Sequence, residues 1–380
     1  MRQERTVVRR KRVGLIVNPL AGMGGRVGLK GTDGADTFRK ARLLGASPES
    51  PRRATDALRV MMRLRGEIDL FTYPLEMGED EAREAGFSPS VIGTIDPGRT
   101  TSEDTQRAAR DLKNVGVDLL LFVGGDGTAR DIYRAVGQDV TVLGVPAGVK
   151  MHSGVFAVNP RSAGEVAVAS LKAERPRLTE AEVMDIDEVS FRRGVVAAKL
   201  YGYLRIPEER SSIQSVKSGG SRTEAQVHRG IASEILKDME EGCLYIFGPG
   251  TTTRDIVTQL HIEKTLLGVD VVLDGRLMAA DVTEHRLADL IEGKKAKIVV
   301  TVIGGQGYIF GRGNQQLSPE IIRSVGRDNL IVVASKQKLA SLGGRPLLAD
   351  TGDETVDRLL DGYVRVVTGL DDYVMYRIGG

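Results

Sequence analysis

The segment that most constrains the fold is the apolar run Leu-Leu-Leu-Phe-Val at 119–123, which passes directly into Gly124-Gly-Asp-Gly-Thr128. A continuous apolar run of this kind is typical of a parallel strand that is buried on both faces, and it predicts a strand over 117–123. Residues 129–136 have helical patterning, and a second apolar run at 140–145 ends at a proline. Strand, helix and strand in this order predict a right-handed parallel unit.

The loop between this strand and helix has the chemistry of a phosphate site. Glycines allow the backbone to approach a ligand closely, and the first amides of a helix are unpaired donors that favour anions. Asp126 would repel a phosphate unless it carries a proton or faces a metal. We therefore interpret it as a general base for a hydroxyl or as a Mg²⁺ contact. The alternative is a tight hairpin turn, since Asp-Gly is a common hairpin pair, but a helical pattern follows it.

The length of 380 residues predicts two domains. We predict an α/β fold in which residues 1–160 form a Rossmann-like lobe with a parallel sheet and carry the glycine-rich loop. Residues 161–380 are predicted to form a second lobe, with an antiparallel β section at about 182–206 and further α/β units at about 223–380.

Composition excludes several classes of protein. The formal net charge is only +2, which gives no global basic field for nucleic acid, and the low aromatic content of 4% argues against base stacking. The single cysteine, Cys243, excludes an internal disulfide framework; it lies in an apolar run that predicts a buried thiol. No apolar stretch approaches the length of a membrane span. We expect a cytoplasmic protein that has neither a nucleic acid nor a membrane as partner.

The GGDGT loop and the upstream segment Ile16-Val-Asn-Pro-Leu-Ala-Gly22 resemble the superfamily of NAD kinases, diacylglycerol and sphingosine kinases and 6-phosphofructokinases. Within it, the chain is most similar to the ATP-NAD kinase family, in its longer prokaryotic branch, over about the first 160 residues. The resemblance implies a phosphotransferase in which Asp126 is the catalytic base or a metal-linked carboxylate. It also implies that the nucleotide phosphates are lined by Asn18, Gly124, Gly125, Gly127 and Thr128.

The implied reaction transfers a phosphoryl group from ATP, or another nucleoside triphosphate, to the adenosine ribose of NAD to give NADP. Mg²⁺ or another divalent cation would assist it. Other small acceptors remain open, such as a sugar, a polyol or a lipid, although the chain has no basic amphipathic helix suited to a lipid surface. A non-catalytic nucleotide-sensing module is a further alternative, which the intact Asp126 disfavours. We expect a homo-oligomer.

Three further loops follow predicted strands and have a similar character. The carboxyl ends of parallel strands meet at one edge of a sheet, so loops from both lobes are expected to face one cleft. The alternative interpretation is a plain connector for loop 146–154, a capped turn for loop 248–254 and glycine turns for loop 304–307. The candidate ligand contacts are Lys150, His152 and Ser153 in loop 146–154, Thr251, Thr252, Thr253 and Arg254 in loop 248–254, and Gly305, Gln306 and Gly307 in loop 304–307, with Gly311-Arg-Gly-Asn314 just beyond it.

Two acidic positions have a structural and a functional interpretation. In the loop Asp350-Thr-Gly-Asp353 an aspartate is predicted to cap the following helix, with a metal or ribose contact as the alternative. Asp131 lies one turn after the glycine loop. It either supports Mg²⁺ or fixes the neighbouring Arg130 or Arg134.

Overall fold

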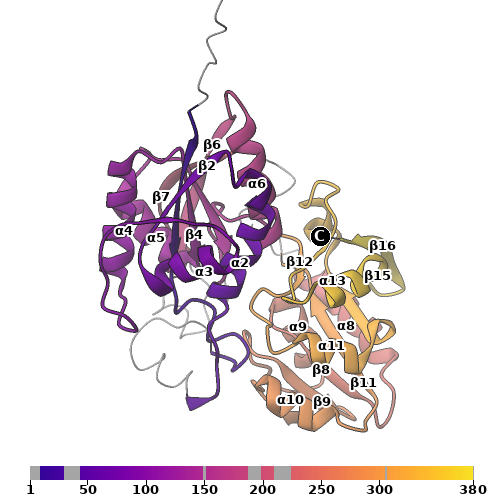
Figure 1. Ribbon diagram of the computed structural model, residues 1–380. Coiled ribbons are helices and arrows are strands. Elements are labelled where there is room, and N and C mark those ends of the chain that lie inside the picture. Colours follow the sequence, from indigo (N-terminus) through magenta and orange to yellow (C-terminus); the bar gives the residue numbers. More distant parts are fainter. Residues whose placement is uncertain are drawn as a thin grey trace, which may run out of the picture. The chain divides into compact units, whose positions relative to one another are not determined.

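The computed structural model describes residues 9–29, 43–148, 151–186, 198–208, 224–303 and 306–379. The chain forms two compact units (Figure 1). Unit 1 comprises Met1–Ala21 and Pro48–Gln214, and unit 2 comprises Gly22–Ser47 and Ser215–Gly380. The division therefore lies well beyond the predicted boundary at 160, and the described residues 22–29 and 43–47 belong with the C-terminal residues.

Unit 1 is built on a parallel sheet in the order β3-β2-β1-β4-β5, which confirms the predicted Rossmann-like lobe. β1 is the central strand of this order, and β4 lies next to it and pairs with β1 and with β5 in parallel register. The five strands are β1 (Lys11–Val17), β2 (Ile68–Thr72), β3 (Ser90–Val91), β4 (Leu119–Gly124) and β5 (Val142–Pro146).

Helices cover both faces of this sheet (Figure 1), and this explains the uninterrupted apolar run in β4. Leu119 and Leu121 pack in a cluster with α2 and α6, whereas Leu120 and Phe122 pack on the opposite face with α4 and α5. The helices are α2 (Ser50–Met61), α3 (Glu79–Glu84), α4 (Ser102–Val115), α5 (Asp126–Val136) and α6 (Pro160–Lys172), with 3₁₀ turns at Met62–Leu64 and Leu75–Met77.

The predicted antiparallel section is present, but it belongs to unit 1 and not to the second lobe. β6 (Leu178–Ile186) and β7 (Ala198–Pro207) form an antiparallel pair. Val183 and Leu204 are fully buried and join the apolar cluster that contains α4 and α5. A backbone bridge between Thr141 and Arg205 also links the pair to the start of β5. Burial of these side chains against α5 places the pair with the N-terminal sheet.

Unit 2 is also α/β, as predicted. Four parallel strands, β8, β11, β13 and β15, form the centre of its sheet, and antiparallel strands flank them in the order β10-β9-β8-β11-β13-β15-β16. These strands are β8 (Leu244–Phe247), β9 (Asp270–Leu273), β10 (Arg276–Ala279), β11 (Ala296–Thr301), β13 (Leu330–Val333), β15 (Gly362–Gly369) and β16 (Asp372–Ile378), and β12 (Tyr308–Phe310) pairs separately with β14 (Leu348–Ala349).

One face of the unit 2 sheet packs against α8 and α9, and the other packs against α10, α11 and α13. Cys243 lies in the first of these two cores and is fully buried, which confirms the prediction of a buried thiol. The helices are α8 (Glu224–Lys237), α9 (Thr251–Thr258), α10 (Glu284–Ile291), α11 (Pro319–Val325), α12 (Lys336–Ala340) and α13 (Glu354–Leu360), with a 3₁₀ turn at Arg327–Asn329.

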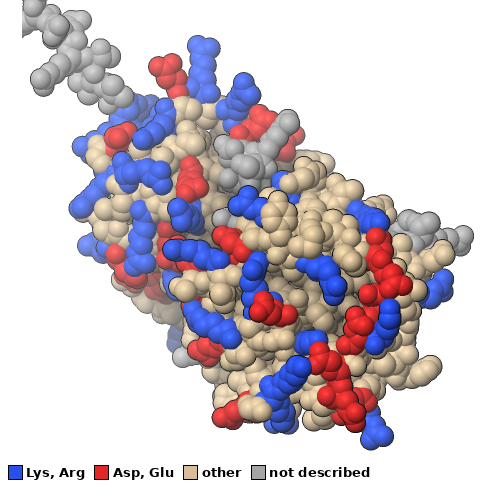
Figure 2. All heavy atoms as spheres, turned by 90° about the vertical axis from the view of Figure 1, so that its right-hand side faces the viewer, with Lys and Arg blue, Asp and Glu red and all other residues tan. Residues whose placement is uncertain are grey.

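Surface charge is mixed in sign, as the balance of 53 basic and 51 acidic residues requires. Figure 2 shows Lys and Arg side chains interspersed with Asp and Glu over the face that it presents. None of the helices in the described part of the chain is long and apolar enough to span a bilayer.

One buried carboxyl in unit 1 makes stability depend on pH. Glu81 on α3 is 3% exposed, and desolvation by burial raises its pKa from 4.5 to about 7. Between these values the native state holds a proton that the unfolded state has lost, so stability falls as pH rises from 4.5 to 7. The full shift corresponds to about 3 kcal/mol.

Glu81→Gln is therefore expected to remove most of this loss and to be more stable than the wild type at pH 8. Denaturant unfolding at pH 4.5 and pH 8 measures the effect. Glu84→Gln, an exposed neighbour on the same helix, is the control and should keep the wild-type dependence. Identical pH profiles for Glu81→Gln and the wild type would contradict the assignment.

Candidate active site at the β4–α5 turn

The glycine-rich loop joins β4 directly to α5. Gly125 is the N-cap of α5 and has no side chain to offer the first amides of the helix. The helix begins at Asp126, three residues earlier than the pattern predicts, so Gly127 and Thr128 lie in its first turn. Asp126 and Thr128 are buried, while Gly125 and Gly127 are half-buried. The turn therefore presents first-turn amides at the carboxyl edge of the sheet.

Close packing leaves little room for a side chain at two glycines of this turn. A Cβ on Gly124 would lie 2.2 Å from Thr128 Oγ1, and a Cβ on Gly125 would lie 3.1 Å from Gly148 Cα. The carbonyl oxygen of Gly124 also accepts hydrogen bonds from the amides of Ala147 and Gly148, at 2.9 and 3.1 Å. The loop that follows β5 thus packs on the loop that follows β4, as neighbouring parallel strands lead us to expect.

Asp126 is held by the backbone of the β5–α6 loop. Its Oδ2 accepts from the amide of His152 at 2.7 Å, and its Oδ1 accepts from the amide of Ser153 at 3.0 Å. The His152 ring Nδ1 lies 3.3 Å from Oδ2, and Asp126 is only 5% exposed. These contacts fix the orientation of the carboxylate, and Oδ1, which accepts from a single amide, retains a second lone pair for a further partner.

Asn18 connects the upstream segment to the same turn. Its Nδ2 donates to Thr128 Oγ1 at 2.9 Å, while its Oδ1 accepts from the amide of Leu20 at 3.1 Å. Asn18 is therefore brought together with the glycine-rich loop, although 110 residues separate it from Thr128.

The other residues predicted in the 146–154 loop differ in their roles. The Ser153 hydroxyl donates to the carbonyl of Met184 and accepts from its amide, both at 2.9 Å, so it anchors β6. His152 is 8% exposed and contacts Asp126 through both its amide and its ring. Lys150 lies outside the described residues.

Asp131 connects two helices. It is 6% exposed, its Oδ1 accepts from Gln106 Nε2 on α4 at 3.0 Å, and burial raises its pKa. Within the described ranges, no group of three or more His, Cys, Asp or Glu side chains is placed to hold a metal ion. A protein cage is not expected for Mg²⁺, which usually takes one or two carboxylates together with waters and substrate phosphates.

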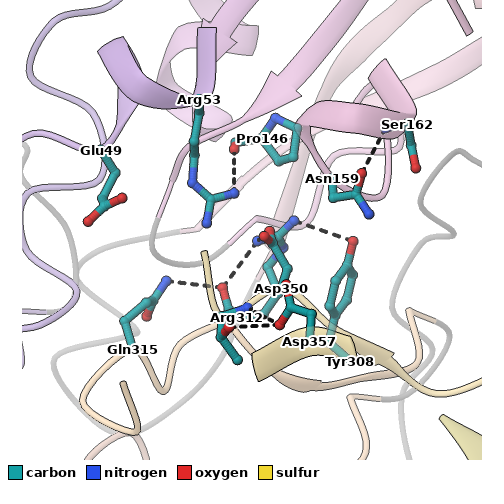
Figure 3. Close-up of polar contacts among 12 residues, drawn as sticks. Glu49, Arg53, Pro146, Asn159, Ser162, Tyr308, Arg312, Gln315, Asp350 and Asp357 are labelled. Carbon is teal, nitrogen blue, oxygen red and sulfur yellow. Dashed lines mark hydrogen bonds and ion pairs between the residues drawn. The ribbon is translucent and has the colours of Figure 1, made fainter. Parts of the chain in front are cut away.

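Two polar residues on α2 also reach this edge of the unit 1 sheet, and the sequence gives no local signal for either. Arg53 is 7% exposed and its Nη1 donates to the carbonyl of Pro146 at 3.0 Å, as Figure 3 shows. Ser50 Oγ donates to the carbonyl of Asn18 at 2.7 Å. A buried guanidinium at the end of β5 adds positive charge where phosphates are expected.

In unit 2, α9 begins within the predicted threonine loop. Thr251 is exposed, whereas Thr252 and Thr253 are fully buried. The Thr253 hydroxyl lies 2.7 Å from the carbonyl oxygen of Gly248 and 3.0 Å from that of Gly250, so it closes the turn. Arg254 contacts the neighbouring Asp255.

The glycine loops farther along unit 2 are turns. The amides of Gln306 and Gly307 both donate to the carbonyl of Ile303, and Gly307 has a positive φ of 85°. Gly305 lies outside the described residues. A Cβ on Gly311 would lie 1.9 Å from the carbonyl oxygen of Asp350, so this glycine is needed where the two loops meet.

The acidic loop before α13 contains a cap and a buried ion pair. Asp353 caps α13 by accepting from the amides of Thr355 and Val356, which confirms the predicted capping role. Asp350 instead pairs with Arg312 Nη1 at 2.7 Å (Figure 3). The Arg312 guanidinium also lies 4.4 Å from the centre of the Tyr308 ring. Asp350 therefore has a structural partner in unit 2.

The chain is thus a two-unit α/β protein with a glycine-rich turn between a buried parallel strand and a helix. Residues 13–174 match the family model of the ATP-NAD kinase N-terminal domain, and residues 240–378 match that of the C-terminal domain. The chain belongs to the ATP-NAD kinase family. No curated protein matches the chain.

Among solved structures, one similar chain is UDP-N-acetylglucosamine 2-epimerase. It shares 10% identity, with 93% of this chain and 77% of that chain covered, at a TM-score of 0.25. This likeness is too weak to bear on fold or function.

The packing at Gly125 leads to a stability prediction. Gly125→Val is expected to displace the backbone at Gly148 and to cost about 1–3 kcal/mol, which lowers the melting temperature by several degrees. Gly66→Val is the control, because a Cβ at Gly66 meets nothing within 4 Å. Equal melting temperatures for the two variants would show that the loops do not pack as described.

Proposed function

We propose that this chain is a NAD kinase that transfers a phosphoryl group from ATP to a hydroxyl of the adenosine ribose of NAD, producing NADP. The observation that carries the proposal is the buried carboxylate of Asp126 at the first position of α5, directly after the glycine N-cap. Membership of the ATP-NAD kinase family supports the phosphotransferase class.

In this proposal the chain supplies orientation and one proton acceptor. The first-turn amides of α5 bind the nucleotide phosphates, and Asn18 orients the Thr128 hydroxyl beside them. Asp126, fixed by the amides of His152 and Ser153, accepts the proton of the ribose hydroxyl as that oxygen attacks the phosphoryl group.

A divalent cation fits the same carboxylate. Asp126 Oδ1 accepts from one amide only and keeps a lone pair, which suits the single-carboxylate coordination that Mg²⁺ commonly takes with bound phosphates. When bound, the cation would neutralise charge on the phosphates. A cleft shared by loops of both units and assembly into a homo-oligomer remain predictions.

A second candidate is a nucleotide-sensing module without catalysis. The two backbone hydrogen bonds that hold Asp126 favour this alternative, because a purely structural aspartate would be held in the same way. Such a protein would bind a nucleotide at the β4–α5 turn but would transfer no phosphoryl group.

An acceptor panel separates these functions. Purified full-length protein is incubated with ATP and Mg²⁺ and with NAD, NADH, sugars, polyols or diacylglycerol in turn, and ADP release is measured. We expect NAD to support the fastest ADP release. Faster ADP release with another acceptor would support a kinase whose substrate is that acceptor and not NAD. If none of the acceptors increases ADP release, the kinase proposal is rejected and the nucleotide-sensing module remains.

A further inference from the structure

The sheet of unit 2 ends in the edge strands β10 and β16, which differ in how well they are protected. β10 has only 4 residues, and its register with β9 shifts between Leu277 and Ala279. Short strands and such irregularities are ways in which proteins keep an edge from pairing with another chain. β16 has 7 residues, and its register with β15 is regular from Tyr373 to Ile378. β16 is therefore the edge that is better suited to pairing.

The backbone of β16 is open along part of this edge. The Leu347 amide donates to the carbonyl of Arg377 at 2.8 Å, and the Gly379 amide donates to the carbonyl of Leu347 at 2.9 Å. Backbone groups face alternate sides along a strand, so the odd-numbered residues of β16 face away from β15. Among the described residues, none bonds to the outward amides and carbonyls of Tyr373 and Met375. The Leu347 segment thus covers only the end of β16.

The side chains at the open part of the edge are large and apolar. Tyr373 and Met375 are 54% and 57% exposed, and they lie on the same face of the sheet. The Arg365 guanidinium lies 5.2 Å from the centre of the Tyr373 ring, so the ring is held on this exposed face. Val374, between them, packs against the apolar core on the opposite face. Exposed apolar side chains on an open strand edge favour pairing with another chain.

This edge is complementary to itself. If two copies of β16 pair in antiparallel orientation about a two-fold axis at Val374, Tyr373 of each copy lies opposite Met375 of the other. The open amides and carbonyls of these residues then bond across the axis, and each Met375 sulfur lies beside a Tyr373 ring. The same register places Asp371 opposite Arg377, and both are exposed. Opposite charges therefore meet on both sides of the axis.

We propose that β16 is a homodimer interface, at which a second copy of this chain adds its own β16 in antiparallel orientation about Val374. The sheet of unit 2 then continues into that of the second copy. An axis at Met375 is disfavoured, because it would require the Arg377 carbonyl, which already accepts from Leu347. The inference does not depend on the proposed function, and it gives the expected homo-oligomer a specific interface.

Sedimentation velocity of the full-length protein over a range of concentrations tests the interface, and we expect a concentration-dependent monomer–dimer equilibrium. Met375→Pro is expected to weaken dimerisation by about 10-fold or more, because proline lacks the amide that faces the second copy. This amide points away from β15, so the bonds within the hairpin are kept, as at other prolines on edge strands. The melting temperature of Met375→Pro shows whether the variant is folded.

Exchange of charges tests the register. Arg377→Asp places two acidic side chains opposite each other and should weaken dimerisation about 10-fold, and Asp371→Arg should do so with two basic ones. The double variant restores opposite charges and should recover most of the affinity. Asp371 has a φ of 49° and accepts from Lys237, so melting temperatures are compared for all three variants. Arg276→Asp, at an exposed arginine of β10, is the matched control and should dimerise as the wild type does.

The outcomes do not depend on phosphoryl transfer, so failure of this inference is distinct from failure of the proposed function. A monomer at every concentration would overturn the interface, whether another segment of this chain or a different protein covers the edge. A dimer that persists unchanged in folded Met375→Pro would also overturn it, because the copies would then meet elsewhere. If the folded double variant did not recover affinity, the axis at Val374 would be wrong.

Discussion

Asp126→Asn is expected to lower phosphoryl transfer by about 10²–10⁴-fold, because the variant loses the group that accepts the proton of the attacking hydroxyl. Nucleotide affinity should be retained or increase, since a negative charge next to the phosphates has been removed. Steady-state turnover and calorimetric ATP affinity, measured on the same preparation, are the readouts.

The contacts of Asp126 also predict a loss of stability in this variant. Both carboxylate oxygens accept a backbone amide, and asparagine has only one oxygen, so either His152 or Ser153 loses its acceptor. A buried donor without a partner costs about 1–3 kcal/mol. Turnover must therefore be expressed per folded molecule.

Asp131→Asn is the matched control for Asp126→Asn. Asp131 is the other buried aspartate of α5, and its oxygen accepts from Gln106 instead of the glycine-rich region. It should change stability without a comparable loss of turnover. Near-normal turnover in folded Asp126→Asn would remove the catalytic assignment and leave Asp126 as a structural residue.

Asp350→Ala should be among the most destabilising single substitutions in unit 2. Removing this carboxylate breaks the buried ion pair with the guanidinium of Arg312, which is 4% exposed. Breaking a buried ion pair from one side typically costs about 3–5 kcal/mol. Denaturant unfolding of the full chain measures the loss.

The double variant Arg312→Met with Asp350→Leu should recover much of that stability, because neither charge is then buried alone. Glu354→Ala is the control, as it removes the partner of an exposed ion pair with Arg358 and should cost about 1 kcal/mol or less. An equally small effect of Asp350→Ala would show that this pair is not buried as described.

The sequence predicts the parallel unit well because its signal is local. The apolar residues of β4 must be buried on both faces, and α4 and α5 on one side and α2 and α6 on the other bury them. The place of the β6–β7 pair was not predictable in this way. A strand pattern indicates which residues are buried, but not that Val183 and Leu204 pack on the side of α5.

The candidate site shows the same division between local and long-range information. Glycine, aspartate and threonine in one loop identify Asp126 and Thr128, and a separate motif identifies Asn18. Arg53 reaches the site from 93 residues away and has no motif. Ser153 was predicted as a ligand contact from its position alone, but its hydroxyl is bonded to Met184. A distant strand can engage a loop side chain in ways that spacing does not reveal.

The central claim is phosphoryl transfer to NAD, and ³¹P NMR of a reaction mixture tests it most directly. Full-length protein is incubated with ATP, Mg²⁺ and NAD, with Asp126→Asn in parallel. We predict that the wild type forms a new phosphomonoester resonance, that of the ribose phosphate of NADP, in equal amount to ADP, and that the variant forms almost none. ADP with only inorganic phosphate, or unchanged ATP and NAD, would contradict the account.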